Sequence, residues 1–480
     1  MRILVTGATG YIGGRLIPEL LKGGHEVRAF VRDPERLRGK EWFSDVEIVK
    51  GDLSDPAAIR EAVRAVDAAY FLVHAMYSGG DFAELEKEYA ENFAWAATTI
   101  NNVIYLGGLL PNNAGTSEHL ESRAKVGEIL RQNGNVTEFR AGPIVGSGSA
   151  SFEMVRYLTE RLPIMVVPRW VKNEVQPIAV RNVIEYLIAA LDVKPLGIVD
   201  IGADVLPFRG MMETFANIRG LRRLIIPVPV LTPLLSGLWV GLITPVPNSL
   251  AVPLVKGIIN PVLADRTNAE KYFPEIKPMD YGEAVRRALE KTKENATETR
   301  WTDSLGTGDT YKLTDKEGLI REIRTVVTDA SPESLFRSFT SIGGEKGWLA
   351  WNWAWKLRGR LDNFLGGPGL KRGRRSKMEL RVGEALDFWR VEDIVEDSHL
   401  LLRAEMKVPG KAWLLFEAIP IDGQRQLVQT AIFEPKGLFG LIYWHALFPI
   451  HSLLFGQMAQ RIVQGAEALE NDVSLTPETI

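Results

Sequence analysis

The sequence contains no cysteine among its 480 residues, and its six histidines are scattered. The missing cysteine excludes disulfide bonds, thiolate–zinc sites and cysteine nucleophiles, and it favours a reducing cytoplasm as the setting. Histidines without an HxxxH-type pair argue against a metal site built by the protein. A net charge of −3 gives no general electrostatic reason to bind nucleic acid. Because the chain opens on a strand pattern, no signal peptide is expected.

Charge is also missing from two long stretches. No charged residue occurs from Leu224 to Val255, where six prolines leave pieces far shorter than the roughly 20 residues that span a bilayer. The stretch Gly437–Phe455 has only His445 and His451 as titratable residues and is divided by Pro449. We interpret both as buried or interface segments; the alternative is that one or both lie on a membrane surface. A spanning helix is the least favoured interpretation.

What the sequence does contain is a glycine-rich turn near its start. The apolar run Ile3–Val5 predicts a buried strand, and the apolar spacing after Gly13 predicts a helix. Glycines at positions 7, 10 and 13 allow a tight turn, a close approach of backbone to phosphate, and close packing of helix on strand. The helix N-terminus presents free N–H groups to a pyrophosphate. We predict a dinucleotide site here; the alternative is a purely structural turn.

Strand-like and helix-like segments alternate from this turn to residue 140. Such alternation predicts an α/β class, with a Rossmann-like, doubly wound parallel sheet and right-handed crossovers. Beyond Gly142 the pattern loosens, and residues 142–295 are expected to form the substrate side of a first domain that spans residues 1–295.

A different pattern follows. Residues 296–315 are predicted to be a linker because charge, threonine and glycine dominate there. Residues 316–472 show strand candidates, among them Glu379–Val382, and then a terminal helix at about His451–Leu469. This order predicts an α+β domain whose curved antiparallel sheet wraps the helix, with a tail at residues 473–480.

The end of the second strand bears on cofactor choice. An acidic side chain there would bind the ribose 2′-hydroxyl of NAD, whereas an arginine would accommodate the 2′-phosphate of NADP. Arg32 occupies this position and Asp33 follows it, so NADP is favoured and NAD stays possible. Asp52, after the third strand, is placed to approach the adenine; the alternative is a helix cap.

The segments Thr6–Gly13, Val31–Pro34 and Gly51–Leu53, together with Asn92 in a long helix, resemble one known group. The first 220 or so residues look like the atypical short-chain dehydrogenase/reductases, in the branch of NmrA-like regulators and the 39-kDa subunit of respiratory complex I. The resemblance implies NAD(P) binding and oxidoreductase chemistry. It also implies the set of residues predicted to hold the dinucleotide: Gly7, Thr9, Gly10, Tyr11, Ile12, Gly13, Arg32, Asp52, Leu53, His74 and Arg123.

The catalytic residues of that superfamily are not present. Its members use a serine after the fifth strand and a YxxxK pair on the next helix, but this chain has Gly107 and Gly108, then His119 and Arg123. Arginine can bind ribose hydroxyls but is a poor proton relay. His119 could act as an acid or base near neutral pH; the alternative is a polar pocket residue. His119, Arg123 and Asn92 are the catalytic candidates, and His74 is expected to line the cleft.

Seven tryptophans lie between residues 348 and 444. Their pattern with neighbouring glycines and aspartates resembles a bacterial domain of unknown function that is fused behind such reductase-like domains. That domain looks like the START/polyketide-cyclase superfamily, which encloses an apolar cavity. The resemblance implies a lipid-like or aromatic ligand; the alternative is that the tryptophans fill a core. The basic run Lys371–Lys377 is interpreted as a solvated loop, or as a contact with anionic headgroups, and not as a nucleic-acid site.

Two hypotheses follow. The first is an NADP(H)-dependent oxidoreductase or isomerase for an apolar, quinone- or lipid-like molecule that the second domain binds or delivers. The second is a non-catalytic NADP-binding redox sensor, or an assembly factor at the membrane, motivated by the loss of serine, tyrosine and lysine together. Both place the protein in the cytoplasm or peripherally on its membrane. The sequence carries no indication of an oligomeric state.

Overall fold

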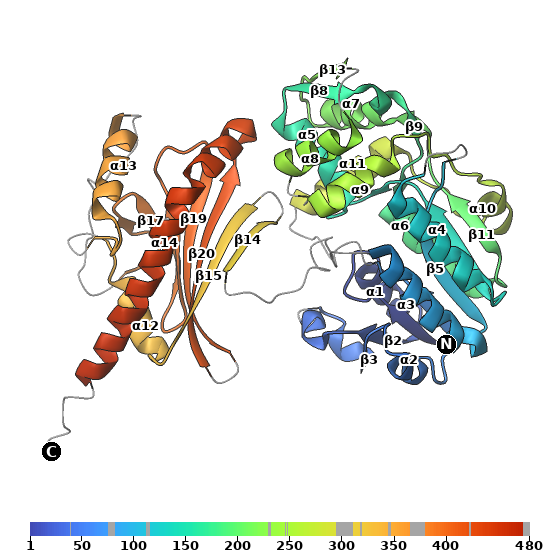
Figure 1. The fold of residues 1–480 in the computed structure, drawn as a ribbon, viewed down its shortest axis with the longest axis horizontal. Helices are drawn as coiled ribbons and strands as arrows, with labels where there is room; N and C mark the ends of the chain where they lie inside the picture. Colours follow the sequence, from blue (N-terminus) through green and yellow to red (C-terminus); the bar gives the residue numbers. More distant parts are fainter. Residues whose placement is uncertain are drawn as a thin grey trace. The chain divides into compact units, whose positions relative to one another are not determined.

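The computed structural model describes all residues except 39, 75–81, 112–115, 229–231, 245, 247, 294–310, 317–318, 344–346, 365–379, 422–423 and 474–480. The chain divides into two compact units, Met1–Gly306 and Thr307–Ile480 (Figure 1). The units are described separately below. The basic run at 371–377 and most of the predicted linker lie outside the described residues.

A seven-stranded parallel sheet forms the centre of the first unit. Its strands, in spatial order, are β11 (Gly197–Ile201), β6 (Val136–Ala141), β5 (Asn102–Gly108), β4 (Ala68–Phe71), β1 (Arg2–Thr6), β2 (Glu26–Val31) and β3 (Glu47–Lys50). The strand order reverses between β1 and β4, which pair directly. The predicted doubly wound sheet is confirmed, and ligands of such sheets bind at this switch point.

Helices cover both faces of the sheet (Figure 1). One core joins the sheet to α1 (Gly13–Lys22), α6 (Val180–Ala189) and α10 (Thr267–Tyr272). The other joins it to α2 (Pro56–Ala62), α3 (Phe82–Ala96) and α4 (Glu118–Arg131). The central strands β1, β4 and β5 are mostly apolar because both of their faces are buried.

The substrate side follows β6. It contains the helices α5 (Ala150–Arg161), α7 (Phe208–Ile218), α8 (Pro233–Ile243), α9 (Asn248–Gly257) and α11 (Tyr281–Lys293), with the short strands β7 (Ile144–Val145), β8 (Ile164–Pro168), β9 (Glu174–Val175), β10 (Ile178–Ala179), β12 (Leu206–Pro207) and β13 (Leu224–Val228). The proline-rich stretch thus folds into a strand and two helices. Thr232 caps α8 and Pro233 occupies its first turn, where a missing N–H costs nothing.

The second unit is a seven-stranded antiparallel sheet with helices. Its strands, in spatial order, are β14 (Tyr311–Lys316), β15 (Leu319–Thr328), β20 (Gln424–Pro435), β19 (Gly410–Ile421), β18 (His399–Ala404), β17 (Trp389–Val395) and β16 (Ala385–Leu386). Between β15 and β16 lie α12 (Pro332–Thr340) and α13 (Asn352–Phe364), and α14 (Gly437–Val473) ends the fold. Helix α14 packs on β15, β20 and α12.

The structure corrects three boundaries in this unit. Residues 311–315, expected in the linker, belong to β14. Residues 380–382 form no strand; pairing begins at Ala385 instead. Helix α14 begins at Gly437 and continues through Pro449, which was expected to divide the stretch. A proline inside a helix removes one backbone hydrogen bond and crowds the preceding turn, yet α14 is continuous through Pro449.

Helix α14 is long and apolar enough to cross a membrane, by length and composition alone. Its inner side chains Trp444, Phe455 and Met458 are buried in the core of the second unit. Core helices of soluble proteins meet the same criterion, so this helix does not decide between the interpretations.

Candidate functional site

The glycine turn closes tightly between β1 and α1. Gly7 has a φ of +74°, and a Cβ there would lie 2.7 Å from the Leu72 carbonyl oxygen. A Cβ on Gly13 would lie 2.3 Å from the Gly7 carbonyl oxygen. Only glycine fits this close crossing of strand and helix, which brings the N-terminus of α1 close to the end of β1. The turn therefore fits a dinucleotide pyrophosphate.

Two arginines from the segment after β2 line the same cavity as the glycine turn. Arg32 is 63% exposed, and its Nε lies 3.8 Å from an Asp52 carboxylate oxygen. Arg36, from the short turn of helix at Pro34–Leu37, lines the same cavity. Asp52 accepts hydrogen bonds from the backbone and hydroxyl of Ser54, while Asp55 caps α2. Asp52 is therefore a turn-forming residue that also lines the cavity, and Arg36 is a cation that the sequence reasoning missed.

A cavity of about 430 Å³ extends from this turn along the switch point. Every predicted dinucleotide residue lines it, and so does His119. The opposite half of the cavity is apolar and comes from α5, α7, α9 and the residue after α9: Met154, Phe208, Met211, Leu250, Leu254 and Ile258. Sequence reasoning missed this half because no motif marks it.

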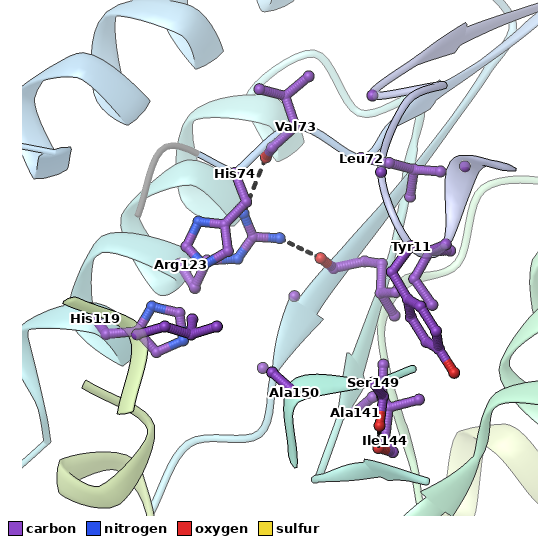
Figure 2. A pocket seen from close by; sticks show the side chains of 18 of the residues that line it. Tyr11, Leu72, Val73, His74, His119, Arg123, Ala141, Ile144, Ser149 and Ala150 are labelled. Carbon is purple, nitrogen blue, oxygen red and sulfur yellow. Dashed lines mark hydrogen bonds between the residues drawn. The ribbon is translucent and has the colours of Figure 1, made fainter. Parts of the chain in front are cut away.

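Arg123 is buried at the floor of the cleft. Its guanidinium donates a hydrogen bond to the carbonyl of Val73, just after β4 (Figure 2). It donates another to the carbonyl of Leu106 in the neighbouring strand β5. It also lies over the Tyr105 ring, 4.8 Å from the centroid. Arg123, which was predicted to bind ribose, thus holds the neighbouring strands β4 and β5 together.

His74 and Glu86 form a buried pair beside Arg123. His74 Nδ1 contacts a Glu86 carboxylate oxygen, and the Ser122 hydroxyl donates to the other oxygen at 2.5 Å. Burial would raise the pKa of Glu86, but these hydrogen bonds hold it below its usual range. An ionised carboxylate only accepts, so His74 Nδ1 carries the proton and Nε2 is an acceptor. Among the described residues, Nε2 has no partner.

His119 stacks on His74. The two ring centroids lie 4.9 Å apart with an interplanar angle of 24° (Figure 2). Burial, reinforced by the nearby His74 and Arg123, lowers the pKa of His119 to about 3, so its imidazole is neutral at physiological pH. Within the described part of the chain His119 Nδ1 is buried without a partner. Both neutral imidazoles line the cavity, and each has a buried ring nitrogen without a partner among the described residues.

The third catalytic candidate lies elsewhere. Asn92 donates a hydrogen bond to the Leu53 carbonyl at 3.0 Å and does not line the cavity. Its position supports a role in holding the loop after β3, and gives no support to the predicted catalytic role. Ser149 lines the cavity, but its hydroxyl already donates to the Ile144 carbonyl.

Comparison with protein families assigns both parts of the chain. Residues 1–145 match the NmrA-like family, and residues 319–458 match a family described as "Protein of unknown function (DUF2867)". The chain carries an NmrA-like domain followed by a DUF2867 domain. The expected START-like character of the DUF2867 domain stays a prediction.

Curated relatives match only segments of the chain. "Sterol demethylase protein B" of Methylococcus capsulatus is 41% identical over 70 residues, which are 15% of this chain and 21% of the relative. "Divinyl chlorophyllide a 8-vinyl-reductase, chloroplastic" of Zea mays is 44% identical over 64 residues, or 12% and 16% of the two chains. A "3 beta-hydroxysteroid dehydrogenase/Delta 5-->4-isomerase" of Mycobacterium tuberculosis is 28% identical over 106 residues, or 22% and 28%. The chain thus spans less than a third of the length of each.

Solved structures resemble the NmrA-like domain more distantly. The Bordetella bronchiseptica enzyme WbmG, solved with NAD, is 14% identical, with a TM-score of 0.48 and coverage of 63% of this chain and 96% of its own. A Thermotoga maritima UDP-glucose 4-epimerase is 13% identical, with a TM-score of 0.46 and coverage of 62% and 100%.

Proposed function

We propose that the protein is an NADP(H)-dependent oxidoreductase for an apolar, ring-containing or lipid-like molecule. One observation carries the proposal: the neutral His74–His119 pair lines the same cavity as the glycine turn and the apolar side chains of α5, α7 and α9. A nicotinamide dinucleotide, when bound, supplies or accepts a hydride. The histidines would handle the accompanying proton.

Different residues bind the dinucleotide and transfer the proton. The turn from Gly7 to Gly13 binds the pyrophosphate, and Arg32 with Arg36 favours a 2′-phosphate. His74 Nε2 accepts the hydroxyl proton of an alcohol substrate, and the resulting imidazolium returns it in the reverse direction. Glu86 orients the ring and stabilises the imidazolium, as a carboxylate does behind a catalytic histidine. This arrangement replaces the missing serine, tyrosine and lysine.

An apolar substrate is supported from two sides. Methionine, phenylalanine, leucine and isoleucine side chains make up the half of the cavity that faces away from the glycine turn. The names of the relatives that match segments of the chain refer to a sterol, a chlorophyllide and a steroid. The DUF2867 domain would bind or deliver the same class of molecule, in keeping with its antiparallel sheet and long helix.

The test is turnover by the full chain. Oxidation of NADPH is followed with a panel of quinones, enones and apolar ketones, and alcohols are tested in reverse with NADP. Glu86→Gln and His74→Gln should lower kcat by roughly 10²–10⁴. Glu84→Gln, on the same helix but exposed, is the matched control.

The pH profile separates a proton-transfer role from a structural one. Burial lowers the pKa of His74 below 6.5, while the hydrogen bond to Glu86 opposes that shift. Alcohol oxidation needs unprotonated Nε2, so kcat/KM should rise with pH through a midpoint below 6.5. Glu86→Gln removes the opposing contribution and should move the midpoint lower. Tight NADPH binding without turnover on any panel member would overturn the proposal in favour of a non-catalytic sensor.

A further inference from the structure

Strands β8 and β13 form a parallel ribbon with an apolar outer face. Ile164 pairs with Leu224, and Val166 pairs with Ile226. These four side chains are 40–57% exposed, whereas Met165 and Ile225 between them are buried. Successive residues of a strand point to opposite faces, so one whole face of this ribbon is apolar and exposed.

Helix α8 extends this surface. Its side chains Leu234, Leu235, Leu238 and Trp239 are 42–52% exposed, and the helix has no charged residue. Val166 of β8 and Trp239 of α8 line the same small cavity of about 60 Å³, so the ribbon and the helix adjoin. We call these eight exposed side chains of β8, β13 and α8 the apolar face. Contiguous apolar surface of this kind marks a docking site.

The small cavity lies next to the cavity of the proposed active site. Met154, Phe208 and Ile258 line both it and the larger cavity that holds the histidine pair. Its other walls are apolar except for the Ser236 hydroxyl and the indole N–H groups of Trp170 and Trp239. Because Val166 and Trp239 are exposed as well as lining it, the small cavity reaches the surface within the apolar face.

Cations flank the apolar face, and Glu160, which precedes β8, is paired with Arg219 at 3.1 Å. No aspartate or glutamate occurs from residue 214 to residue 264, a span that includes Arg219, Arg222, Arg223 and Lys256. Arg222 is exposed just before β13, and Arg169 is exposed just after β8. Since the two strands are parallel, exposed cations stand at both ends of the ribbon. An apolar surface with cationic edges and a tryptophan complements an anionic lipid surface.

We propose that the apolar face docks the protein on an anionic phospholipid bilayer, with the opening of the small cavity toward the lipid. Docking in this orientation serves to load an apolar substrate from the bilayer. That role rests on the proposed function, whereas the docking itself does not. Leucine and isoleucine side chains enter the headgroup–acyl boundary, and Arg169 and Arg222 contact phosphates.

The experiment measures co-sedimentation of the full-length protein with vesicles. Wild type should sediment with phosphatidylcholine–phosphatidylglycerol vesicles and much less with phosphatidylcholine alone. The pair L235Q and L238Q, in one chain, should weaken binding at least about tenfold, because each leucine loses its transfer into lipid. The pair R169Q and R222Q should weaken binding to the anionic vesicles by about fivefold per arginine.

Trp95→Gln is the matched control, since Trp95 is 57% exposed on α3 of the same domain and should leave binding unchanged. NADPH binding confirms that each variant is folded. The proposal is overturned if wild type ignores vesicles, if L235Q with L238Q binds like wild type, or if ultracentrifugation shows instead a dimer that those substitutions dissociate. Vesicle binding requires no turnover, so its failure leaves the proposed function standing.

Discussion

The two halves of the large cavity differ in what forms their walls, which is mainly backbone in one half and side chains in the other. The nucleotide half is backbone: a turn whose shape depends on the absence of side chains at Gly7 and Gly13. The substrate half is side chain: apolar groups from α5, α7 and α9 that no local pattern identifies. A site made by backbone geometry constrains which residues can stand there, whereas a site made by apolar side chains tolerates many combinations. The nucleotide half can therefore be predicted from the sequence, whereas the substrate half can be recognised only in the folded structure.

The largest expected effect is in the nucleotide half. Gly13→Ala places a Cβ against the Gly7 carbonyl and must displace the turn from the pyrophosphate. Losing two hydrogen bonds to a charged group, each worth about 1.5–3 kcal/mol, should weaken NADPH binding about a hundredfold or more. Fluorescence titration measures it. Gly282→Ala, whose added Cβ would find its nearest atom at 3.3 Å, is the control; equal NADPH affinity in both variants would contradict the site.

A smaller effect concerns the choice of dinucleotide. Arg32→Gln should weaken NADPH binding by about tenfold and leave NADH binding unchanged, because the guanidinium is exposed and its contact with a 2′-phosphate is screened. Calorimetry with both nucleotides measures the ratio, and Arg38→Gln, outside the cavity lining, serves as the comparison. Tighter binding of NADH than NADPH by wild type would reverse the assignment.

The smallest effect falls in the substrate half. Leu254→Ala removes part of one half-buried apolar wall, worth about 1 kcal/mol, and should raise KM for an apolar substrate about fivefold. The Kd for NADPH should not change. If NADPH affinity fell while KM rose, the two halves would not be separate, and the comparison would be wrong.

The sequence predicted the first domain well because its signals are local. Apolar strands and the spacing of Gly7, Gly10 and Gly13 are decided within a few residues, and the structure has those elements. The pairing of His74 with Glu86 could not be predicted, since it depends on how α3 lies against the end of β4. Helix α14 was predicted too short because Pro449 is a local break signal that long-range packing overrides.

The clamp made by Arg123 has a consequence for the sheet. One guanidinium joins the carbonyls of Val73 and Leu106, so it braces the floor of the cleft before any ligand arrives. A lysine, the residue usual at this position in the resembled superfamily, carries one ammonium point charge in place of a rigid fork. The entropic cost of ordering that floor falls on folding and not on binding. With arginine in place of lysine, this position has a side chain that does not transfer a proton but holds two strands together rigidly.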